Sequence, residues 1–557
     1  MEKSGWHQIK TNHLVIGAGI AGLVTALELL KRGEQVLIVD AQGEDRLGGL
    51  ARIAFGGMAL IGTPEQKRLS IPDSPERALR DWMSFAELGE LDIWPKQWAE
   101  LYCERSRLDI YDYIRKLGVR FLPAVNWIER GWHVLGNSLP RYHILWGGSA
   151  FLVEKIKQQL YSFPKEKIRF LFNTKATKLL KSNGRVNGCL LESFDSVSEP
   201  DVQNLIVRNL IVRNSIEKKE IEVSADNVII AAGGFSGDLE RVKKNWPESW
   251  GHPPQQLLNG SHPTNDGRLH DQVIGHGGQV THLNKMWNYA AGVAKANPEF
   301  EGEGLSLIPC KSALWLDASG ARIGPEPLVT GFDTYELCQR LSQLPFEHSW
   351  QVLNRRIAEK ELAISGAEHN PMIRDRKLFG LLKETLLGNS RLVNQMLAEN
   401  ECFVSANNLK TLVERMNQIN EGVRVEFDKV RNSIETYDQM VLSGKKFWND
   451  EQLRRITQLR RWSSEKIRTC YPKPIIDGSE LIAIKLKLIT RKSLGGIQTN
   501  LNSQVMGVDG NPIEGLFAVG EAAGFGGGGA SGKRSLEGTF IAGCILTARQ
   551  AVRYLTS

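Results

Sequence analysis

Apolar runs, glycine-rich turns and amphipathic segments alternate along the chain, and the pattern is clearest near the N-terminus. The apolar run 13–16 is typical of a buried parallel strand, and it leads directly into a glycine-rich turn at 17–22. Residues 21–32 then read as a helix that ends at Gly33, and a second apolar strand follows at 36–40. The pattern therefore predicts a strand–turn–helix–strand unit of the α/β class.

The spacing of the glycines in this unit indicates a dinucleotide site. Gly17 allows the tight turn, Gly19 lets the backbone approach a pyrophosphate, and Gly22 lets the helix pack against the strand. The N-terminus of the helix favours the negative charge of the phosphates. Asp40, 18 residues after Gly22, ends the second strand, where its carboxylate can accept hydrogen bonds from a ribose. The alternative is a glycine-rich turn in an ordinary α/β unit.

The remaining pattern indicates that the two chain ends form one domain. Buried strands are predicted at 228–234 and 515–520, a last helix at 539–554, and a strongly helical region with apolar stripes at 333–419. We therefore expect a nucleotide-binding domain made of residues 1–285 and 486–557, with a helix-rich substrate or cap domain, 286–485, inserted between them.

Several shorter segments complete this prediction. A tandem repeat, NLIVR at 204–208 and again at 209–213, predicts an extension of a surface strand. The other expected elements are helices over 75–117, a segment 136–152 leading into a helix that reaches about residue 161, and strands within 119–132, 168–193 and 486–496.

Composition narrows the class of protein. At 557 residues the chain can form two or three domains, and 41% hydrophobic and 24% charged residues are ordinary for a globular protein. The net charge of +7 is modest and favours a basic site for an anionic ligand. Because no dense Lys/Arg run with interleaved aromatic residues occurs, a nucleic-acid partner is not expected.

Cysteine usage and the N-terminus bear on the compartment. The seven cysteines are widely spaced and form no CxxC motif, which argues against a disulfide framework, a metal site or an iron–sulfur cluster. The polar N-terminus does not resemble a signal peptide, and no uncharged apolar stretch is long enough to span a bilayer. We expect a cytoplasmic protein without an integral membrane segment.

A second glycine-rich region near the C-terminus also carries candidate chemistry. Glu521 directly follows the apolar strand 515–520, and an acid there can bind the hydroxyl groups of a ribityl chain. The glycine-rich loop 524–529 then leads to the N-terminus of the last helix, which can stabilise negative charge on a reduced flavin. A linker is the alternative interpretation, but linkers seldom lie between a buried strand and a buried helix.

Several motifs occur together in the order found in a known flavoprotein superfamily. They are GAGIAG at 17–22, the glycine pairs 48–49 and 56–57, VIIAAGG at 228–234, CFVSANNLKTL at 402–412, RKSLGGIQTN at 491–500, GLFAVGEAAG at 515–524 and KRSLEGT at 533–539. As a set they resemble the FAD-binding fumarate reductase and succinate dehydrogenase flavoproteins. The likeness is greatest to the branch of FAD-binding dehydrogenases related to 3-ketosteroid dehydrogenases, and it covers nearly the whole chain.

This resemblance implies a Rossmann-type FAD-binding domain built from both chain ends and an inserted helix-rich α+β cap. It also implies that hydride passes between flavin N5 and a carbon of a CH–CH bond next to a carbonyl or carboxylate. The electron acceptor stays open. The residues assigned to the cofactor, from this likeness and from the glycine pattern, are Gly17, Gly19, Gly22, Asp40, Gly48, Gly49, Gly56, Gly57, Gly233, Glu521 and Gly538.

Departures from the family pattern limit what is implied about the chemistry. Membrane-bound relatives link a His to the flavin, but no His lies at 43–58, so we expect non-covalent FAD. Fumarate-reducing relatives have a proton-donating Arg where this chain reads PEPLVTGFD, 325–333. Ketosteroid-dehydrogenating relatives have a Tyr before the Gly-Gly turn, and 481–488 holds none. Neither catalytic set is intact.

The candidate catalytic residues come from several segments. Arg534 matches the family's carboxylate-binding Arg, and Arg491 occupies the place of a substrate-binding His; with Lys492 and Lys533 they would bring four cations to one cleft. The further candidates are His143 with Arg141 at the mouth of the site, and Tyr289 as a residue that transfers a proton. For each of them a structural role is the alternative.

Three functions remain open from the sequence. The first is a FAD-dependent dehydrogenase or reductase acting on a small carbonyl- or carboxylate-bearing substrate, including 3-ketosteroid-like molecules. The second is a fumarate reductase-like module that passes electrons to a separate partner. The third is a flavin-binding protein with a degenerate active site.

Overall fold

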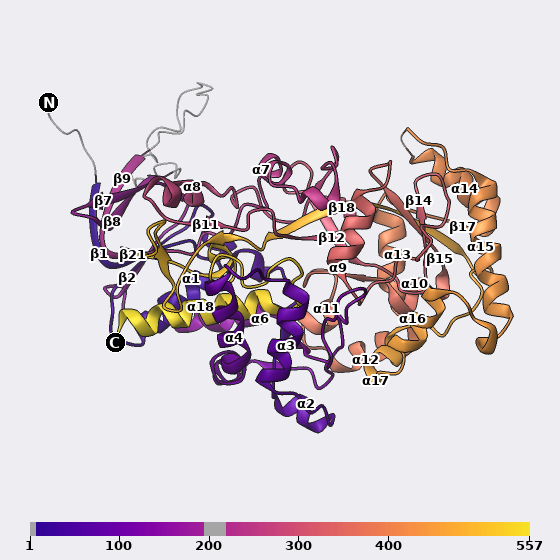
Figure 1. Ribbon diagram of the computed structural model, residues 1–557, viewed down its shortest axis with the longest axis horizontal. Helices are drawn as coiled ribbons and strands as arrows, with labels where there is room; N and C mark the ends of the chain where they lie inside the picture. Colours follow the sequence, from indigo (N-terminus) through magenta and orange to yellow (C-terminus); the bar gives the residue numbers. More distant parts are fainter. Residues whose placement is uncertain (1–6, 194–218, 421) are drawn as a thin grey trace, which may run out of the picture.

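The computed structural model describes residues 7–193, 219–420 and 422–557. Two sheets organise the molecule, one at each end of its long axis in Figure 1. The tandem repeat at 204–213 lies outside the described residues. Within the described part of the chain, no helix is long and apolar enough to cross a membrane.

The first sheet joins the two ends of the chain. Its strand order is β20-β21-β9-β1-β2-β6, and β7 and β8 continue it as an antiparallel hairpin on β9. The C-terminal β21 pairs in parallel with β9, and β9 pairs in parallel with β1, so the prediction of one domain from both ends is confirmed. The strands are β1 (His7–Ile16), β2 (Val36–Val39), β6 (Ile168–Leu171), β7 (Thr174–Ser182), β8 (Arg185–Ser193), β9 (Lys219–Ile230), β20 (Gln504–Met506) and β21 (Pro512–Ala518).

Two helices cover one face of this sheet. Every residue of α1 (Ile20–Leu30) is buried, because α1 lies between the sheet and the C-terminal α18 (Thr539–Leu555). Figure 1 shows α18 running beside α1 in the lower left. Since all residues of α1 except Thr25 and Glu28 are apolar or glycine, its composition is that of a core helix and not that of a surface helix. The glycine-rich turn before α1 is therefore held on a rigid support.

The second sheet forms around one long strand. β18 pairs with β12, β15, β17 and β10, and its last residues reach back toward the first sheet. β18 begins five residues before the predicted strand 486–496. It therefore runs across residue 486, where the boundary between the cap and the C-terminal segment was predicted. The strands are β10 (Leu258–Asn259), β12 (Met286–Ala294), β13 (Gly304–Ile308), β14 (Leu314–Asp317), β15 (Ser349–Asn354), β16 (Ala363–Ile364), β17 (Phe403–Ala406) and β18 (Leu481–Ser493).

Helices of the inserted segment surround this second sheet. They are α9 (Thr334–Ser342), α10 (Arg355–Glu361), α11 (Pro371–Arg374), α12 (Leu378–Leu387), α13 (Ser390–Glu399), α14 (Leu409–Gln418), α15 (Phe427–Leu442), α16 (Glu451–Leu459) and α17 (Ser463–Arg468). The α+β cap implied by the resemblance is thus present. The prediction of a strongly helical region over 333–419 is confirmed by the helices α9 to α14, but the strands β15, β16 and β17, which were not predicted, also lie inside it. All six residues of β15 are buried, so it shows no alternation that would distinguish a strand from a helix.

A helical layer connects the two sheets at the lower side of Figure 1. It carries a small sheet in which β5 pairs with β3 and β4. The helical prediction for 75–117 is confirmed. These elements are β3 (Gly57–Ala59), α2 (Pro64–Arg68), α3 (Pro75–Ala86), α4 (Ile93–Arg105), α5 (Asp112–Lys116), β4 (Arg120–Phe121), β5 (Tyr142–Trp146) and α6 (Gly148–Leu160); α7 (Leu239–Lys244) and α8 (Arg268–Gly275) follow β9.

Candidate functional site

The turn after β1 has one glycine that the fold itself requires. Gly17 has φ +108°, and a Cβ atom added there would lie 2.4 Å from the Ala231 carbonyl oxygen. Its N–H donates to the Val39 carbonyl at 2.7 Å, which ties the turn to β2. Gly17 therefore fixes the turn against two neighbouring strands.

Gly19 is different, because the space beside it is open. A Cβ atom added at Gly19 would meet no atom of the described chain within 4 Å. Gly19 is also the N-cap of α1, and no side chain in the described part caps this end or places an acid in its first turn. The open N-terminus of a buried helix is suited to an anionic group such as a pyrophosphate. The chain thus fits a dinucleotide here.

Asp40 follows β2 at the end where the turn also lies. One carboxylate oxygen accepts the Ala18 N–H at 2.6 Å, and the other accepts the Gln42 N–H at 2.8 Å. Burial raises the pKa of Asp40, and these two backbone donors oppose that shift. The side chain is therefore held in a fixed orientation at the edge of the pocket, where an adenosine ribose is predicted.

One pocket brings most of the predicted cofactor residues together. We call it the FAD pocket, and the predicted residues that line it are Gly17, Gly19, Asp40, Gly48, Gly49, Gly233, Glu521 and Arg491. The other predicted glycines, Gly22, Gly56, Gly57 and Gly538, are not among the lining residues. They lie where chain segments pack closely: a Cβ atom at Gly22 would be 1.9 Å from the Gly17 carbonyl oxygen, and one at Gly538 would be 2.5 Å from the Ala59 nitrogen.

The C-terminal end of β18 supplies the wall of the FAD pocket near Glu521. Glu521 accepts hydrogen bonds from the Ser493 N–H at 3.0 Å and the Ser493 hydroxyl at 3.3 Å. Burial raises the pKa of this carboxyl group, and the Lys492 ammonium opposes the shift. Glu521 therefore links the strand β18 to the turn after β21.

Lys492 also lines the FAD pocket, and its charge is not paired. Its Nζ lies 4.4 Å from the centre of the Phe540 ring, but it forms no ion pair with a carboxylate of the described residues. Burial, with the charge of Arg491 as the second cause, lowers the pKa of the Lys492 amine to about 8. An amine with this pKa can accept or donate a proton near neutral pH.

Arg491 lies where the FAD pocket meets a second cavity, which we call the side cavity. This cavity of about 610 Å³ shares Arg491, Gln42, Arg46, Gly49, Leu50 and Asn265 with the FAD pocket. One Arg491 nitrogen, Nη1, donates to the Gly260 carbonyl at 2.6 Å, whereas the buried Nε has no hydrogen-bond partner among the described residues. A buried donor without a partner is costly and is expected to meet a ligand.

Tyr289 packs against the apolar cluster that contains Trp287 and Phe540. Its hydroxyl donates to Glu537 Oε2 at 2.7 Å, and the Trp287 Nε1–H donates to the same oxygen at 3.1 Å. Burial raises the pKa of Tyr289 well above its ordinary range, and the nearby Glu537 charge adds to this shift. Tyr289 is therefore a protonated hydrogen-bond donor that holds Glu537.

Arg534 lies in an ion-pair cluster and is not among the residues that line the FAD pocket. We call this group, with Asp333, Glu87 and Lys533, the Arg534 cluster. The Arg534 Nε–H donates to Asp333 at 2.8 Å, and Glu87 accepts from the same guanidinium group. Lys533 pairs with Glu87 at 2.9 Å. The guanidinium charge is thus matched by two carboxylates, and the structure gives no support to the predicted contact with a substrate.

A buried acid lies next to this cluster. Glu129 accepts hydrogen bonds from the Thr334 N–H at 3.1 Å and the Thr334 hydroxyl at 2.6 Å. Burial raises the pKa of Glu129 to about 8, and the charge of Asp333 adds to the shift. This carboxyl group is therefore largely protonated at neutral pH.

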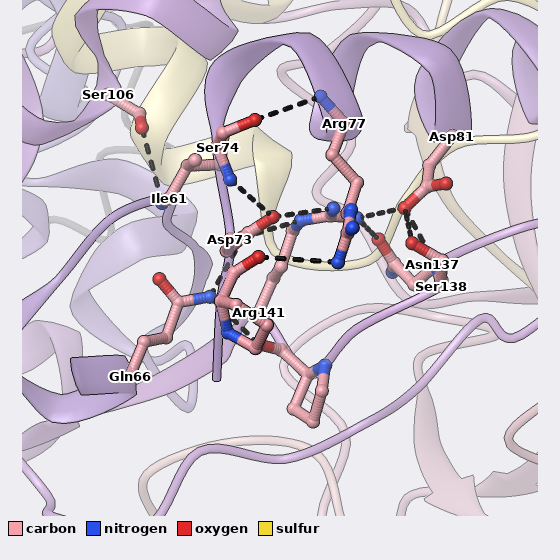
Figure 2. Close-up of polar contacts among 12 residues, drawn as sticks. Ile61, Gln66, Asp73, Ser74, Arg77, Asp81, Ser106, Asn137, Ser138 and Arg141 are labelled. Atoms are coloured by element: carbon pink, nitrogen blue, oxygen red, sulfur yellow. Dashed lines mark hydrogen bonds and ion pairs between the residues drawn. The ribbon is translucent and has the colours of Figure 1, made fainter. Parts of the chain in front are cut away.

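His143 and Arg141 lie inside the helical layer and not at the FAD pocket. His143 is fully buried between the Thr63 hydroxyl at 2.8 Å and the Arg141 carbonyl at 2.7 Å, and burial lowers its pKa to about 4. Figure 2 shows Arg141 surrounded by acceptors: Asp73 takes two hydrogen bonds at 2.8 Å and Asp81 one at 2.5 Å. These bonds join the loop before β5 to α3.

Sequence reasoning did not single out several residues of the pocket wall. Phe525 and Phe540 line the FAD pocket from the glycine-rich loop and from α18. Lys175, paired with Asp266 at 2.8 Å, lines it near Asp40. Lys492, by contrast, has a signal in the sequence, since it directly follows Arg491 and was predicted with it as one of four cations in one cleft. Lys175 has no such signal, because its partner comes from a distant loop.

Comparisons with known proteins agree with this geometry. The sequence profile of the family described as FAD binding domain matches residues 12–541. A KsdD-like steroid dehydrogenase of Mycobacterium tuberculosis is 39% identical over 97% of this chain and 94% of its own length. The fold is similar to that of 3-ketosteroid Δ1-dehydrogenase from Sterolibacterium denitrificans (TM-score 0.68, 13% identity, 98% of this chain and 99% of that one). It is also similar to a flavocytochrome c3 fumarate reductase (TM-score 0.66, 18% identity, 98% and 78%).

Proposed function

Because the chain belongs to this family of FAD-binding oxidoreductases, we propose that it removes two hydrogens from a C–C bond next to the ketone of a steroid. The name of the M. tuberculosis relative supports the substrate class, since it is 39% identical over nearly the full length of both chains. The observation in this chain that carries the proposal is the unpaired Lys492 ammonium beside Arg491 in the FAD pocket.

The residues of the FAD pocket divide into those that hold the cofactor and those that serve the chemistry. The N-terminus of α1 with Gly19 would hold the diphosphate, Asp40 the adenosine ribose and Glu521 the ribityl chain. When bound, FAD accepts the hydride that leaves the substrate. Everything else that the reaction needs is supplied by side chains.

Lys492 is the residue that we assign to the proton. Oxidation next to a ketone also removes a proton from the carbon beside the carbonyl, and a base must accept it. The lowered pKa of Lys492, about 8, leaves a usable fraction of neutral amine near physiological pH. The Phe540 ring covers the amine on one side, which limits the access of water.

Arg491 is the residue that we assign to the carbonyl oxygen. Its Nη1 is held by the Gly260 carbonyl, so the guanidinium plane is fixed and the unpartnered Nε–H remains for a ligand. A positioned cation stabilises the negative charge that builds on the oxygen as the proton leaves. The side cavity beyond Arg491, with about 610 Å³, lies in the size range of a ligand pocket and can take the body of the substrate.

Tyr289 is assigned as a positioning residue. It remains protonated and orients Glu537, whose negative charge acts on Lys492 and opposes the lowering of its pKa. Tyr289→Phe should therefore shift the pH profile of the reaction while leaving bound FAD in place. His143 and Arg534 take no part in this proposal.

The proposal is tested by anaerobic reduction of the FAD-loaded protein. We expect a 3-ketosteroid to bleach the flavin absorbance and to yield an unsaturated ketone, whereas succinate should leave the flavin oxidised. Bleaching by succinate alone would favour a fumarate reductase-like module. If neither class of donor bleaches the flavin, the assigned reaction is wrong. Lys492→Gln, loaded with FAD, is the matched control: it should keep the flavin but be reduced by the steroid more slowly than wild type, because it lacks the assigned base.

A further inference from the structure

Helix α12 presents an apolar face to solvent. None of its ten residues is buried. The exposed fractions are 87% for Phe379, 75% for Leu387, 64% for Leu386, 53% for Leu378 and 48% for Leu382. A surface helix usually turns its polar side outward and its apolar side to the core. In α12 these five large apolar side chains face solvent instead.

The exposed residues form one continuous stripe. Leu378, Leu382 and Leu386 are spaced four residues apart and so fall on the same side of the helix, with Phe379 and Leu387 beside them. The opposite side is anchored, since Lys360 Nζ of α10 donates to the Thr385 carbonyl at 3.1 Å. The apolar stripe is therefore a fixed feature of the surface, of the kind that marks a binding site.

Basic residues surround this stripe. Arg374, Arg376 and Lys377 precede α12 and Lys383 lies within the exposed side, and all four are exposed. The two acids of this segment are already bound, Asp375 by Arg374 at 2.7 Å and Glu384 by Arg391 at 3.3 Å. α17 lies next to α12 (Figure 1), and its exposed Ile467 is flanked by Lys466 and Arg468. An apolar stripe with a basic border complements an anionic lipid surface.

The segment that precedes α12 lines the side cavity. Ala367 and His369 come before α11, Arg374 is the last residue of α11, and all three line that cavity; Arg374 is exposed as well. The side cavity in turn shares Arg491 with the FAD pocket. A path therefore leads from the surface beside α12 to the residues assigned to the reaction.

We propose that α12 binds the surface of an anionic lipid bilayer, with Phe379, Leu386 and Leu387 inserted at the headgroup boundary. The side cavity then opens beside the membrane surface. The delivery of a steroid from the bilayer through this cavity rests on the proposed function, whereas binding of α12 to lipid does not. α12 has ten residues, so it lies on the bilayer and does not cross it.

Flotation of the FAD-loaded protein with lipid vesicles tests the proposal. We expect binding to vesicles of mixed phosphatidylcholine and phosphatidylglycerol. Phe379→Ser and Leu386→Ser should each weaken this binding about tenfold, because each removes a large apolar side chain from the interface. Leu442→Ser is the matched control: Leu442 is 73% exposed at the end of α15, away from this stripe, and its loss should not change vesicle binding.

The charge of the border is tested separately. Lys383→Gln should weaken binding to anionic vesicles about fivefold, since a basic residue near such a surface contributes about 1 kcal/mol. Vesicles of phosphatidylcholine alone should bind wild-type protein less tightly, and added salt should reduce the difference between the two vesicle types.

Two results would overturn the proposal. One is equal vesicle binding by wild type and the Phe379→Ser/Leu386→Ser double variant. The other is a dimer in lipid-free solution that the same double variant converts to monomer, because a second copy of this chain would then be what covers α12. Since neither measurement uses the enzymatic reaction, failure of the proposed function would not affect the outcome.

Discussion

Lys492 in the FAD pocket and Arg534 in the Arg534 cluster are both cations, but among the described residues only Arg534 is paired with carboxylates. Arg534 is matched by Asp333 and Glu87, so its guanidinium is satisfied within the protein. Lys492 forms no ion pair in the described part of the chain: its ammonium lies over the Phe540 ring, and the Glu537 and Glu521 charges act on it from beyond ion-pair distance. Buried charges that support a fold are usually paired. The difference teaches that an unmatched charge identifies a ligand site better than the presence of a cation does.

The largest effect is expected from the glycines of the turn after β1. Here the contrast is between open space beside Gly19 and close packing beside Gly17. Gly19→Val should give a folded protein without flavin, because its side chain would fill the room left for the diphosphate, while its Cβ atom meets no atom of the described chain within 4 Å. The readouts are the flavin absorbance and the circular dichroism spectrum. Wild-type FAD should be released by acid, since residues 43–58, where a covalent link to His would be expected, hold no His.

Gly17→Val is the matched control for this prediction. Its side chain would approach the Ala231 carbonyl to 2.4 Å in a backbone conformation that favours glycine, so the protein should not fold. If Gly19→Val retains the flavin spectrum, Gly19 does not lie at the diphosphate.

The next largest effect concerns Lys492. Lys492→Met should slow reduction of the flavin by steroid by about 10²–10⁴, the usual contribution of a general base, while the free energy of unfolding stays close to that of wild type. The wild-type rate should rise with pH through about 8, because the neutral amine is the base, and the variant should lose this rise. Stopped-flow absorbance measures both. If Lys492→Met reduced the flavin at the wild-type rate, Lys492 would not be the base that accepts the proton.

The same substitution at Arg534 should have the opposite outcome. Arg534→Met leaves Asp333, which is 1% exposed, without its partner, and breaking a buried pair in this way costs about 3–5 kcal/mol of stability. Urea denaturation measures this loss, and the flavin of the folded fraction should still be reduced. A stable Arg534→Met protein that binds FAD but is not reduced would instead support the contact with substrate predicted from the sequence.

A smaller effect is expected from Glu129. Its pKa of about 8 lies above the ordinary value near 4.3, so the folded state binds the proton more tightly than the unfolded state. This contribution to stability is complete below the ordinary pKa and is lost as pH rises through about 8. Glu129→Gln should therefore flatten the fall in unfolding free energy over this pH window. An unchanged slope in the variant would show that Glu129 is ionised at neutral pH.

Local motifs account for what could be predicted from the sequence. Residues 13–40 form the expected strand, turn, helix and strand, because each element depends on neighbours within a few residues. β15 and β17 were not predicted, since β15 is fully buried and β17 has only four residues, so neither strand shows a clear alternation. Their place in the structure is fixed by pairing with β18, far away in the chain.

The candidate site divides in the same way. Gly17, Gly19 and Asp40 at the FAD pocket follow from spacing, whereas Gly48, Gly49 and Gly233 were assigned with the help of the family resemblance. The state of Arg534 depends on partners 201 and 447 residues away, and no pattern in the sequence indicates which carboxylates will meet it. Arg141 is a further example, as Asp73 and Asp81 precede it by 68 and 60 residues. A sequence identifies a cation, but only the fold decides whether its charge is already used.

The course of β18 couples the two halves of the molecule mechanically. The strand runs through the second sheet, and its last three residues are Arg491, Lys492 and Ser493, of which Ser493 is bonded to Glu521 in the turn after β21. If the second sheet moved as a rigid body, Arg491 and Lys492 would move with it, since a paired strand transmits force along its length. If the cap moves relative to the FAD pocket, Arg491 and Lys492, the two residues proposed for the reaction, would therefore move together.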